Sequence, residues 1–307
     1  MKRTASGVAV PGAMVGAVLG AVLGAVLGMC ASGFGQNNDK PAAQNPPAGQ
    51  AAQAAGQTAA PAGKRPPKVN SQEEFTAYKA AAALTDAPAL EKAADDFAAK
   101  YPDSELRPLL YRSAMQRYQM GNNADKMLEM GRKVLAIDPD DPEALVGQAQ
   151  VLAERTRDAD LDRDQRLAEA RKDAERSLLT VDTDIPTSGY PPEQLNAYKG
   201  YLRSEAYAVL GKLSSDSKNW PDAETNLRKS IDAFPQQVDS IAVLRLAVAL
   251  DMQNKIPEAL KYADQAVELT KDRPDSGAGK AARDEKDRLT KLNVGAAPGQ
   301  TSTPPKN

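Results

Sequence analysis

One segment of this chain, residues 204–237, recurs almost position for position further along the sequence. The first copy carries Tyr207, Leu210, Gly211, Trp220, Ala223, Leu227 and Pro235. Adding 36 to each number gives Val243, Leu246, Ala247, Ile256, Ala259, Ala263 and Lys271, and all but the last are apolar or small. A period of about 20–50 residues indicates an array of stacked units, each of which buries its apolar face against its neighbours. This repeat therefore predicts an all-α protein made of helix pairs.

The composition agrees with thin, closely packed helices. Hydrophobic residues make up 41% of the chain but aromatic residues only 5%, and alanine is abundant. This argues against a β-sandwich, which uses more aromatic and β-branched residues. The net charge is −2, and loss of the first 35 residues would remove Lys2 and Arg3 and no acid, giving −4. That balance lacks the basic excess of a nucleic-acid-binding protein.

Histidine is absent, and Cys30 is the only cysteine. The chain therefore lacks the commonest general base and the usual soft metal ligands. It also cannot form an intramolecular disulfide. We expect no catalytic residues and no cofactor, and an enzyme relying on carboxylates alone is the least favoured alternative.

Residues 1–35 have the pattern of an export signal, with Lys2 and Arg3 preceding an apolar run. Cleavage is expected after Gly35, and Met29 directly before Cys30 argues against lipid attachment. The apolar run is long for a signal, and glycines that allow close helix approach recur in it every fourth residue, at Gly16, Gly20, Gly24 and Gly28. An exported periplasmic or extracellular protein is therefore expected, and the alternative is an uncleaved membrane anchor with the protein facing the periplasm.

The segment 36–70 is rich in alanine, proline and glutamine. Such a segment buries too little apolar surface to offset the entropy of ordering it, so it predicts a disordered linker. The tail 294–307 has a similar composition. The foldable region is therefore 71–293.

About five helix pairs are expected in this region, followed by a capping helix over 280–292. Ser71 and Glu74 form a capping-box pattern at the start of the first helix. Proline-containing turns near Pro102 and Pro139 separate the first three pairs. The third pair contains a charged insertion over 155–166, and an unusually long helix is expected over 192–213.

The residues of the two C-terminal copies, together with the turn Lys100-Tyr-Pro-Asp-Ser104, resemble the tetratricopeptide repeat family. The resemblance covers roughly residues 71–272 and extends to uncharacterised exported bacterial members. It departs from the family pattern at Ser214, at Lys218 in place of the turn glycine, and at the insertion. The resemblance implies a right-handed superhelical solenoid that acts as a non-catalytic protein-binding scaffold in the bacterial cell envelope. The alternative is a membrane-tethered envelope-assembly or cell-wall coordination factor.

The resemblance also implies a concave groove that holds a peptide or a partner helix of unknown identity. Projecting the repeat register onto this groove selects Tyr111, Met115, Tyr118, Val146, Gln150, Ala208, Lys212, Leu244 and Val248. Tyr111 and Tyr118 are the best contact candidates, because aromatic side chains provide contact area at low entropic cost. The alternative is that both tyrosines pack on the neighbouring repeat. Among the positions used by chaperone-binding repeats, only Lys212 carries a suitable lysine.

One acidic loop resembles a calcium-binding pattern. Its carboxylates occupy positions 1, 3, 5 and 12 of that pattern, at Asp158, Asp160, Asp162 and Glu169. Arg163 stands where the pattern requires glycine, and three further arginines, Arg155, Arg157 and Arg166, lie close by. We therefore expect a solvated loop whose acids pair with arginine, and calcium binding by this loop is the less favoured alternative. Two further acid pairs, Asp95-Asp96 and Asp140-Asp141, are expected to be solubilising or helix-capping groups.

Overall fold

The computed structural model describes residues 63–186 and 191–295 of the chain. Within these ranges the fold is all-α, as predicted, and the only other regular feature is an isolated bridge between Lys64 and Pro186. The predicted export signal, most of the predicted linker and nearly all of the predicted tail lie outside the described residues. No helix in the described part of the chain has the length and apolarity needed to cross a bilayer.

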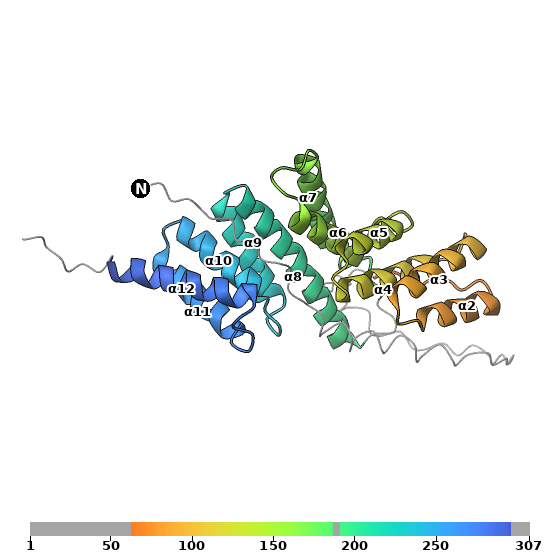
Figure 1. The fold of residues 1–307 in the computed structure, drawn as a ribbon. Coiled ribbons are helices and arrows are strands. Elements are labelled where there is room, and N and C mark those ends of the chain that lie inside the picture. Colours follow the sequence, from red (N-terminus) through yellow and green to blue (C-terminus); the bar gives the residue numbers. More distant parts are fainter. Residues whose placement is uncertain (1–62, 187–190, 296–307) are drawn as a thin grey trace, which may run out of the picture.

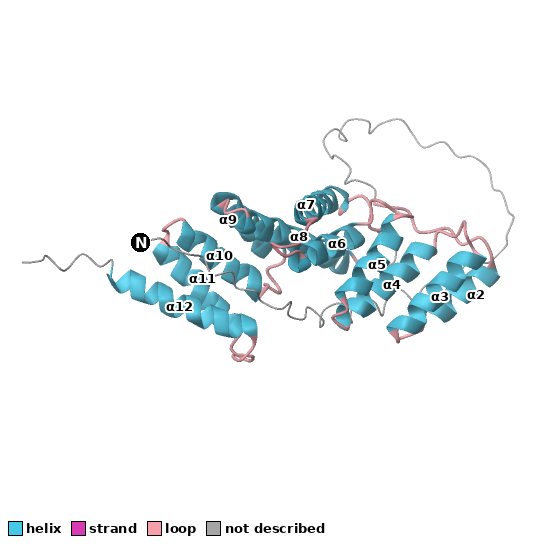
Figure 2. Cartoon of the chain, turned by 45° about the horizontal axis from the view of Figure 1, so that its top comes forward, coloured by secondary structure: helices cyan, strands magenta, loops and turns pink. Residues whose placement is uncertain are grey.

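The helices follow one another in a row, with α2 at one end and α12 at the other (Figures 1 and 2). Their bounds are α2 (Gln72–Ala82), α3 (Ala87–Lys100), α4 (Arg107–Met120), α5 (Ala124–Leu135), α6 (Pro142–Arg155), α7 (Arg163–Thr180), α8 (Pro192–Asp216), α9 (Trp220–Ala233), α10 (Ser240–Met252), α11 (Ile256–Leu269) and α12 (Gly277–Gly295). Each helix packs against its neighbours in sequence. We call α2, α4, α6, α8 and α10 the first helices and α3, α5, α7, α9 and α11 the second helices.

First helices also contact one another: α2 packs on α4, α6 on α8, and α8 on α10. The last helix, α12, packs on both α10 and α11, as expected for the predicted capping helix. The long helix predicted over 192–213 is α8, which continues to Asp216.

Helix starts follow the local sequence signals. The capping box of Ser71 and Glu74 is present at α2. Asp86, Asp141 and Asp239 each accept a backbone N–H in the first turn of the following helix. These side chains satisfy N–H groups that the helix itself leaves unpaired, which fixes where each helix begins.

The turns inside three of the pairs share one backbone conformation. Each contains a residue with positive φ, namely Asn122 (53°), Lys218 (60°) and Asn254 (63°). The residue that follows each of them donates its N–H to the carbonyl five positions earlier, in the bonds Asn123 to Tyr118, Asn219 to Ser214, and Lys255 to Leu250. The second and third turns are 36 residues apart (254 − 218), which is the offset of the sequence repeat.

Small residues allow the paired helices to approach closely. Ala114, Ala149 and Ala247 are fully buried on the first helices. A Cβ atom built on Gly211 would lie 2.6 Å from Cγ of Leu227 on the second helix of the same pair. The core therefore forms as a series of clusters between successive helices.

Candidate functional site

The nine predicted groove residues all lie on first helices, but they differ in accessibility. Five are buried, with Tyr111 and Tyr118 each 6% exposed, and the others being Met115, Val146 and Leu244. The remaining four are partly exposed, namely Gln150, Ala208, Lys212 and Val248. The accessible members beyond Gln150 therefore lie on α8 and α10.

Both tyrosines of α4 bind the preceding helix pair. The Tyr111 hydroxyl donates to Asp95 Oδ1 at 2.9 Å, and the Tyr118 hydroxyl donates to Glu91. Both acceptors lie on α3. Burial, followed by the hydrogen bond to Glu91, raises the pKa of Tyr118 to about 12. These side chains thus pack on the neighbouring repeat, which was the alternative considered for them.

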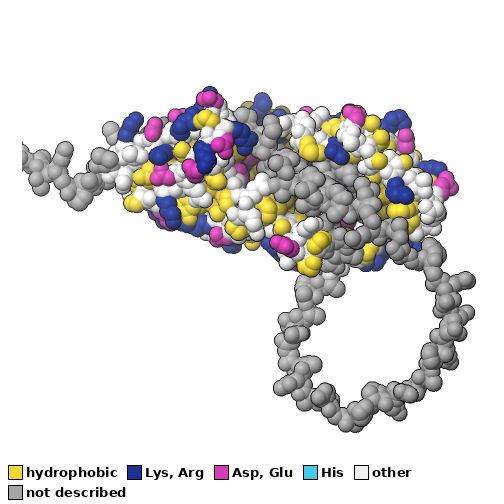
Figure 3. Space-filling view, turned by 90° about the horizontal axis from the view of Figure 1, so that it is seen from below, with side chains coloured by type: hydrophobic (Ala, Val, Ile, Leu, Met, Phe, Trp, Pro, Cys, Tyr) yellow, Lys and Arg dark blue, Asp and Glu magenta, His cyan; other side chains and the backbone are white. Residues whose placement is uncertain are grey.

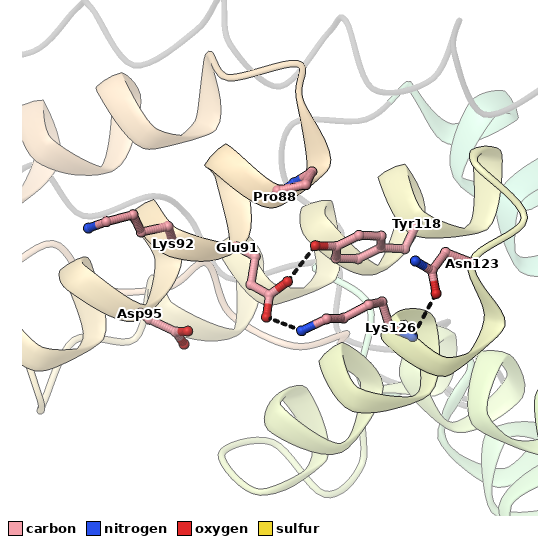
Figure 4. A pocket seen from close by; sticks show the side chains of 7 residues that line it. All are labelled: Pro88, Glu91, Lys92, Asp95, Tyr118, Asn123 and Lys126. Atoms are coloured by element: carbon pink, nitrogen blue, oxygen red, sulfur yellow. Dashed lines mark hydrogen bonds and ion pairs between the residues drawn. The ribbon is translucent and has the colours of Figure 1, made fainter.

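The cleft in Figure 4 lies beside this contact, between α3 and the α4–α5 turn, and has a volume of about 410 Å³. Its polar groups already have partners, some within the cleft and some beside it. Lys126 Nζ lies 2.8 Å from Glu91 Oε1, and Glu91 also accepts the Tyr118 hydroxyl. No nucleophile paired with a general base lines this cleft.

A buried polar cluster joins α4, α6 and α8. Arg112 pairs with Asp141, and Glu143 accepts hydrogen bonds from the Tyr198 hydroxyl and from Gln116 Nε2, the latter at 2.5 Å. Burial raises the pKa of Glu143, and the nearby Arg112 opposes that shift. Sequence reasoning missed this cluster because Glu143 is 27 residues from Gln116 and 55 from Tyr198.

A second buried carboxylate, Glu205 on α8, accepts a hydrogen bond from Gln150 Nε2 at 2.9 Å. Burial, followed by repulsion from Asp239, raises its pKa to about 8. Arg245 of α10 and Glu154 of α6, which form an ion pair at 2.7 Å, lie close enough to affect the pKa of Glu205 as well. Gln150, one of the predicted groove residues, is therefore used inside the protein.

Three of the four acids of the calcium-like loop have protein partners. Asp158 Oδ1 lies 3.2 Å from Arg163 Nε, and Asp160 Oδ2 accepts the Arg157 N–H at 2.9 Å. Glu169 accepts Gln148 Nε2 at 3.1 Å, and Asp162 directly precedes α7. Within residues 63–186 and 191–295, no three histidine, cysteine, aspartate or glutamate side chains are grouped so that they could hold a metal ion.

The other acid pairs also have structural roles. Asp95 and Asp96 bind Lys133 and Lys92, respectively. Asp140 pairs with Arg176, while Asp141 caps α6. On the face shown in Figure 3, basic and acidic side chains are interspersed, without a large area of a single sign.

No protein-family model matches this chain, and no curated protein is significantly similar to it. The tetratricopeptide resemblance therefore depends on the residue pattern described above.

Proposed function

We propose that this protein is a non-catalytic docking scaffold, built as a right-handed superhelical solenoid of tetratricopeptide-like helix pairs. The observation that carries the proposal is the order of packing. Each helix contacts its sequence neighbours, and successive first helices contact one another along much of the row. Three turns with the same positive-φ geometry support a repeating unit. Such an array presents a preformed surface, so a partner segment binds without reordering the scaffold.

The docking face in this proposal is the accessible part of the groove on α8 and α10. Ala208 and Val248 offer partly exposed apolar surface there. Lys212 lies on the same helix as Ala208 and pairs only with the exposed Asp216 four residues later, at 2.7 Å. The Asp216 side chain is 39% exposed and the Lys212 side chain 16% exposed, so the pair is open to solvent on the side of Asp216, where an acid of a partner would approach. The surface therefore suits a peptide or partner helix that carries apolar side chains and at least one acid.

The absence of histidine and the pairing of the acids described above support a binding role over catalysis. The export pattern of residues 1–35 favours a location in the bacterial cell envelope. The second candidate, a membrane-tethered assembly factor, is favoured by the four-residue glycine spacing in that segment. Carbonate extraction of cell membranes separates the two, because an uncleaved anchor keeps the protein in the pellet.

Site-specific photo-crosslinking tests the docking face. A photoreactive amino acid replaces Val248 in the full-length protein, and the matched control replaces Thr225, an exposed residue of α9. We expect a discrete partner adduct from position 248 that is lost when Ala208→Glu is added, and no such adduct from position 225. Equal adducts at both positions, or none at position 248, would contradict the proposed face.

A further inference from the structure

The residues that precede α2 lie along the row of helices instead of extending away from it. The loop before α2 runs back past several helices (Figure 2), and Lys64 forms a bridge with Pro186 in the α7–α8 connection. Composition assigned these residues to a disordered linker, but residues 63–70 make specific contacts. We call residues 64–68, Lys-Arg-Pro-Pro-Lys, the strap.

One end of the strap is held by two helix connections. Lys64 Nζ lies 2.7 Å and 2.6 Å from the two carboxylate oxygens of Asp138, in the α5–α6 connection. It also lies 3.6 Å from Asp184 Oδ1, in the α7–α8 connection. The two carboxylates are shielded, with side-chain exposures of 18% for Asp138 and 23% for Asp184.

The other end binds the α3–α4 connection through Glu105. The two terminal nitrogens of Arg65 donate to the two Glu105 oxygens at 2.7 Å and 2.6 Å, a bidentate geometry that is strong for an ion pair. The backbone N–H of Lys68 donates to Glu105 Oε2 at 2.8 Å. The hydrogen bond from Arg65, which has the largest effect, and that from the Lys68 backbone lower the pKa of Glu105 to about 2.

The strap is bound almost entirely by charge. Pro66 and Pro67 favour an extended backbone and offer no N–H of their own. Arg65, Pro66 and Lys68 are exposed, so little apolar area is buried. The pair between Arg65 and Glu105 is exposed, and exposed ion pairs are individually weak and are screened by salt, whereas the pairs of Lys64 are partly shielded and are screened less. The strap stays bound because α2 begins only a few residues later, which keeps its effective concentration high.

We propose that residues 64–68 form a salt-releasable strap that determines where the preceding chain leaves the helical array. With the strap bound, the chain before Gly63 departs beside the α7–α8 connection, in the middle of the row. With the strap released, it departs from α2 at the end of the row. Release also frees seven residues, 64–70, which adds up to about 24 Å of reach. This inference is independent of the proposed docking face, so either can fail alone.

Limited trypsin digestion of the full-length protein tests the strap. The Lys64–Arg65 bond is a trypsin site that the bound strap protects, whereas the Arg65–Pro66 bond is resistant because proline follows it. Cleavage after Lys64 is followed by mass spectrometry. We expect the combined substitution Glu105→Gln and Asp138→Asn to accelerate it about three- to ten-fold, because cleavage follows the population of the open form. The control is Asp103→Asn, which removes an exposed acid of the α3–α4 connection that forms no ion pair with the strap.

A second variant, Arg65→Gln, weakens the strap without altering any helix connection, and circular dichroism verifies that each variant keeps its helix content. Raising NaCl from about 0.05 M to about 0.5 M should accelerate cleavage of the wild type but not of the combined variant. Rates are corrected by digesting free peptides of residues 60–70 with the same substitutions. The proposal would be overturned if neither the combined variant nor Arg65→Gln changed the rate of cleavage after Lys64, or if Asp103→Asn accelerated this cleavage as much as they do.

Discussion

The contact between Gly211 of α8 and Leu227 of α9 provides a sharp test of the repeat. Both residues are buried, and a Cβ atom on Gly211 would lie 2.6 Å from Cγ and 2.8 Å from Cδ2 of Leu227. At the corresponding positions 36 residues later, the chain carries Ala247 and Ala263, both fully buried. One repeat thus combines glycine with leucine, and the next combines alanine with alanine. The double substitution Gly211→Ala with Leu227→Ala would convert the first combination into the second.

The magnitudes predict strong coupling between the two sites. Gly211→Ala gains about 1 kcal/mol of helix propensity but forces an overpacked contact costing about 1–3 kcal/mol, for a net loss of roughly 0–2 kcal/mol. Leu227→Ala leaves a cavity and costs about 2–5 kcal/mol. In the double variant the clash is gone, and the added methyl group fills part of the cavity. We expect the double variant to be more stable than the sum of the single losses by about 1–3 kcal/mol.

Urea unfolding of the four proteins measures this coupling. Trp220 is the only tryptophan and begins α9, so its fluorescence reports on this helix pair. Circular dichroism, followed in parallel, reveals whether the rest of the array unfolds separately, which is common in repeat proteins. If the two losses of unfolding free energy simply add, with a coupling below about 0.5 kcal/mol, the Gly211–Leu227 and Ala247–Ala263 combinations do not fill the same space between paired helices, and the reasoning is refuted.

Two further substitutions test the turn geometry and the buried acid. Lys218→Gly should stabilise the protein by roughly 0.5–1 kcal/mol in urea unfolding, because φ is 60° at this position and glycine adopts positive φ without steric cost. Asn254→Gly should change the stability less, since asparagine tolerates this conformation. Burial raises the folded pKa of Glu205 to about 8, so this residue costs no stability below its unfolded pKa, destabilises the fold progressively as the pH rises from there to about 8, and costs a constant amount above that. Glu205→Gln should therefore lose less stability than the wild type between pH 5 and pH 9, by roughly 2–4 kcal/mol; equal pH dependence would contradict a buried, titrating Glu205.

The local architecture was predictable because its signals are short-range. The apolar spacing around Leu210 and Leu246 predicts helices, and the capping box of Ser71 and Glu74 marks a helix start that the structure contains. The position of Lys218 in place of the turn glycine identified the turn that proved to have positive φ. Each of these features depends on residues within a few turns of one another, so one sequence is sufficient to predict them.

The site was less predictable, because a register projection places residues on a helix face without showing what covers that face. Tyr118 was placed in the groove, but its hydroxyl binds Glu91 on α3. Gln150 was placed there too, and it donates to Glu205. Composition likewise assigned residue 64 to a linker, yet Lys64 binds Asp138, 74 residues away.

The sequence by itself determined that this chain forms α-helices in pairs, where those helices begin, and which residues are small enough to let them pack. Only the tertiary structure decided which polar side chains meet across helices and which part of the predicted groove stays accessible. The physical reason is that helix periodicity and capping arise within a few residues, whereas ion pairs such as that between Arg245 and Glu154, 91 residues apart, exist only once the helices have stacked.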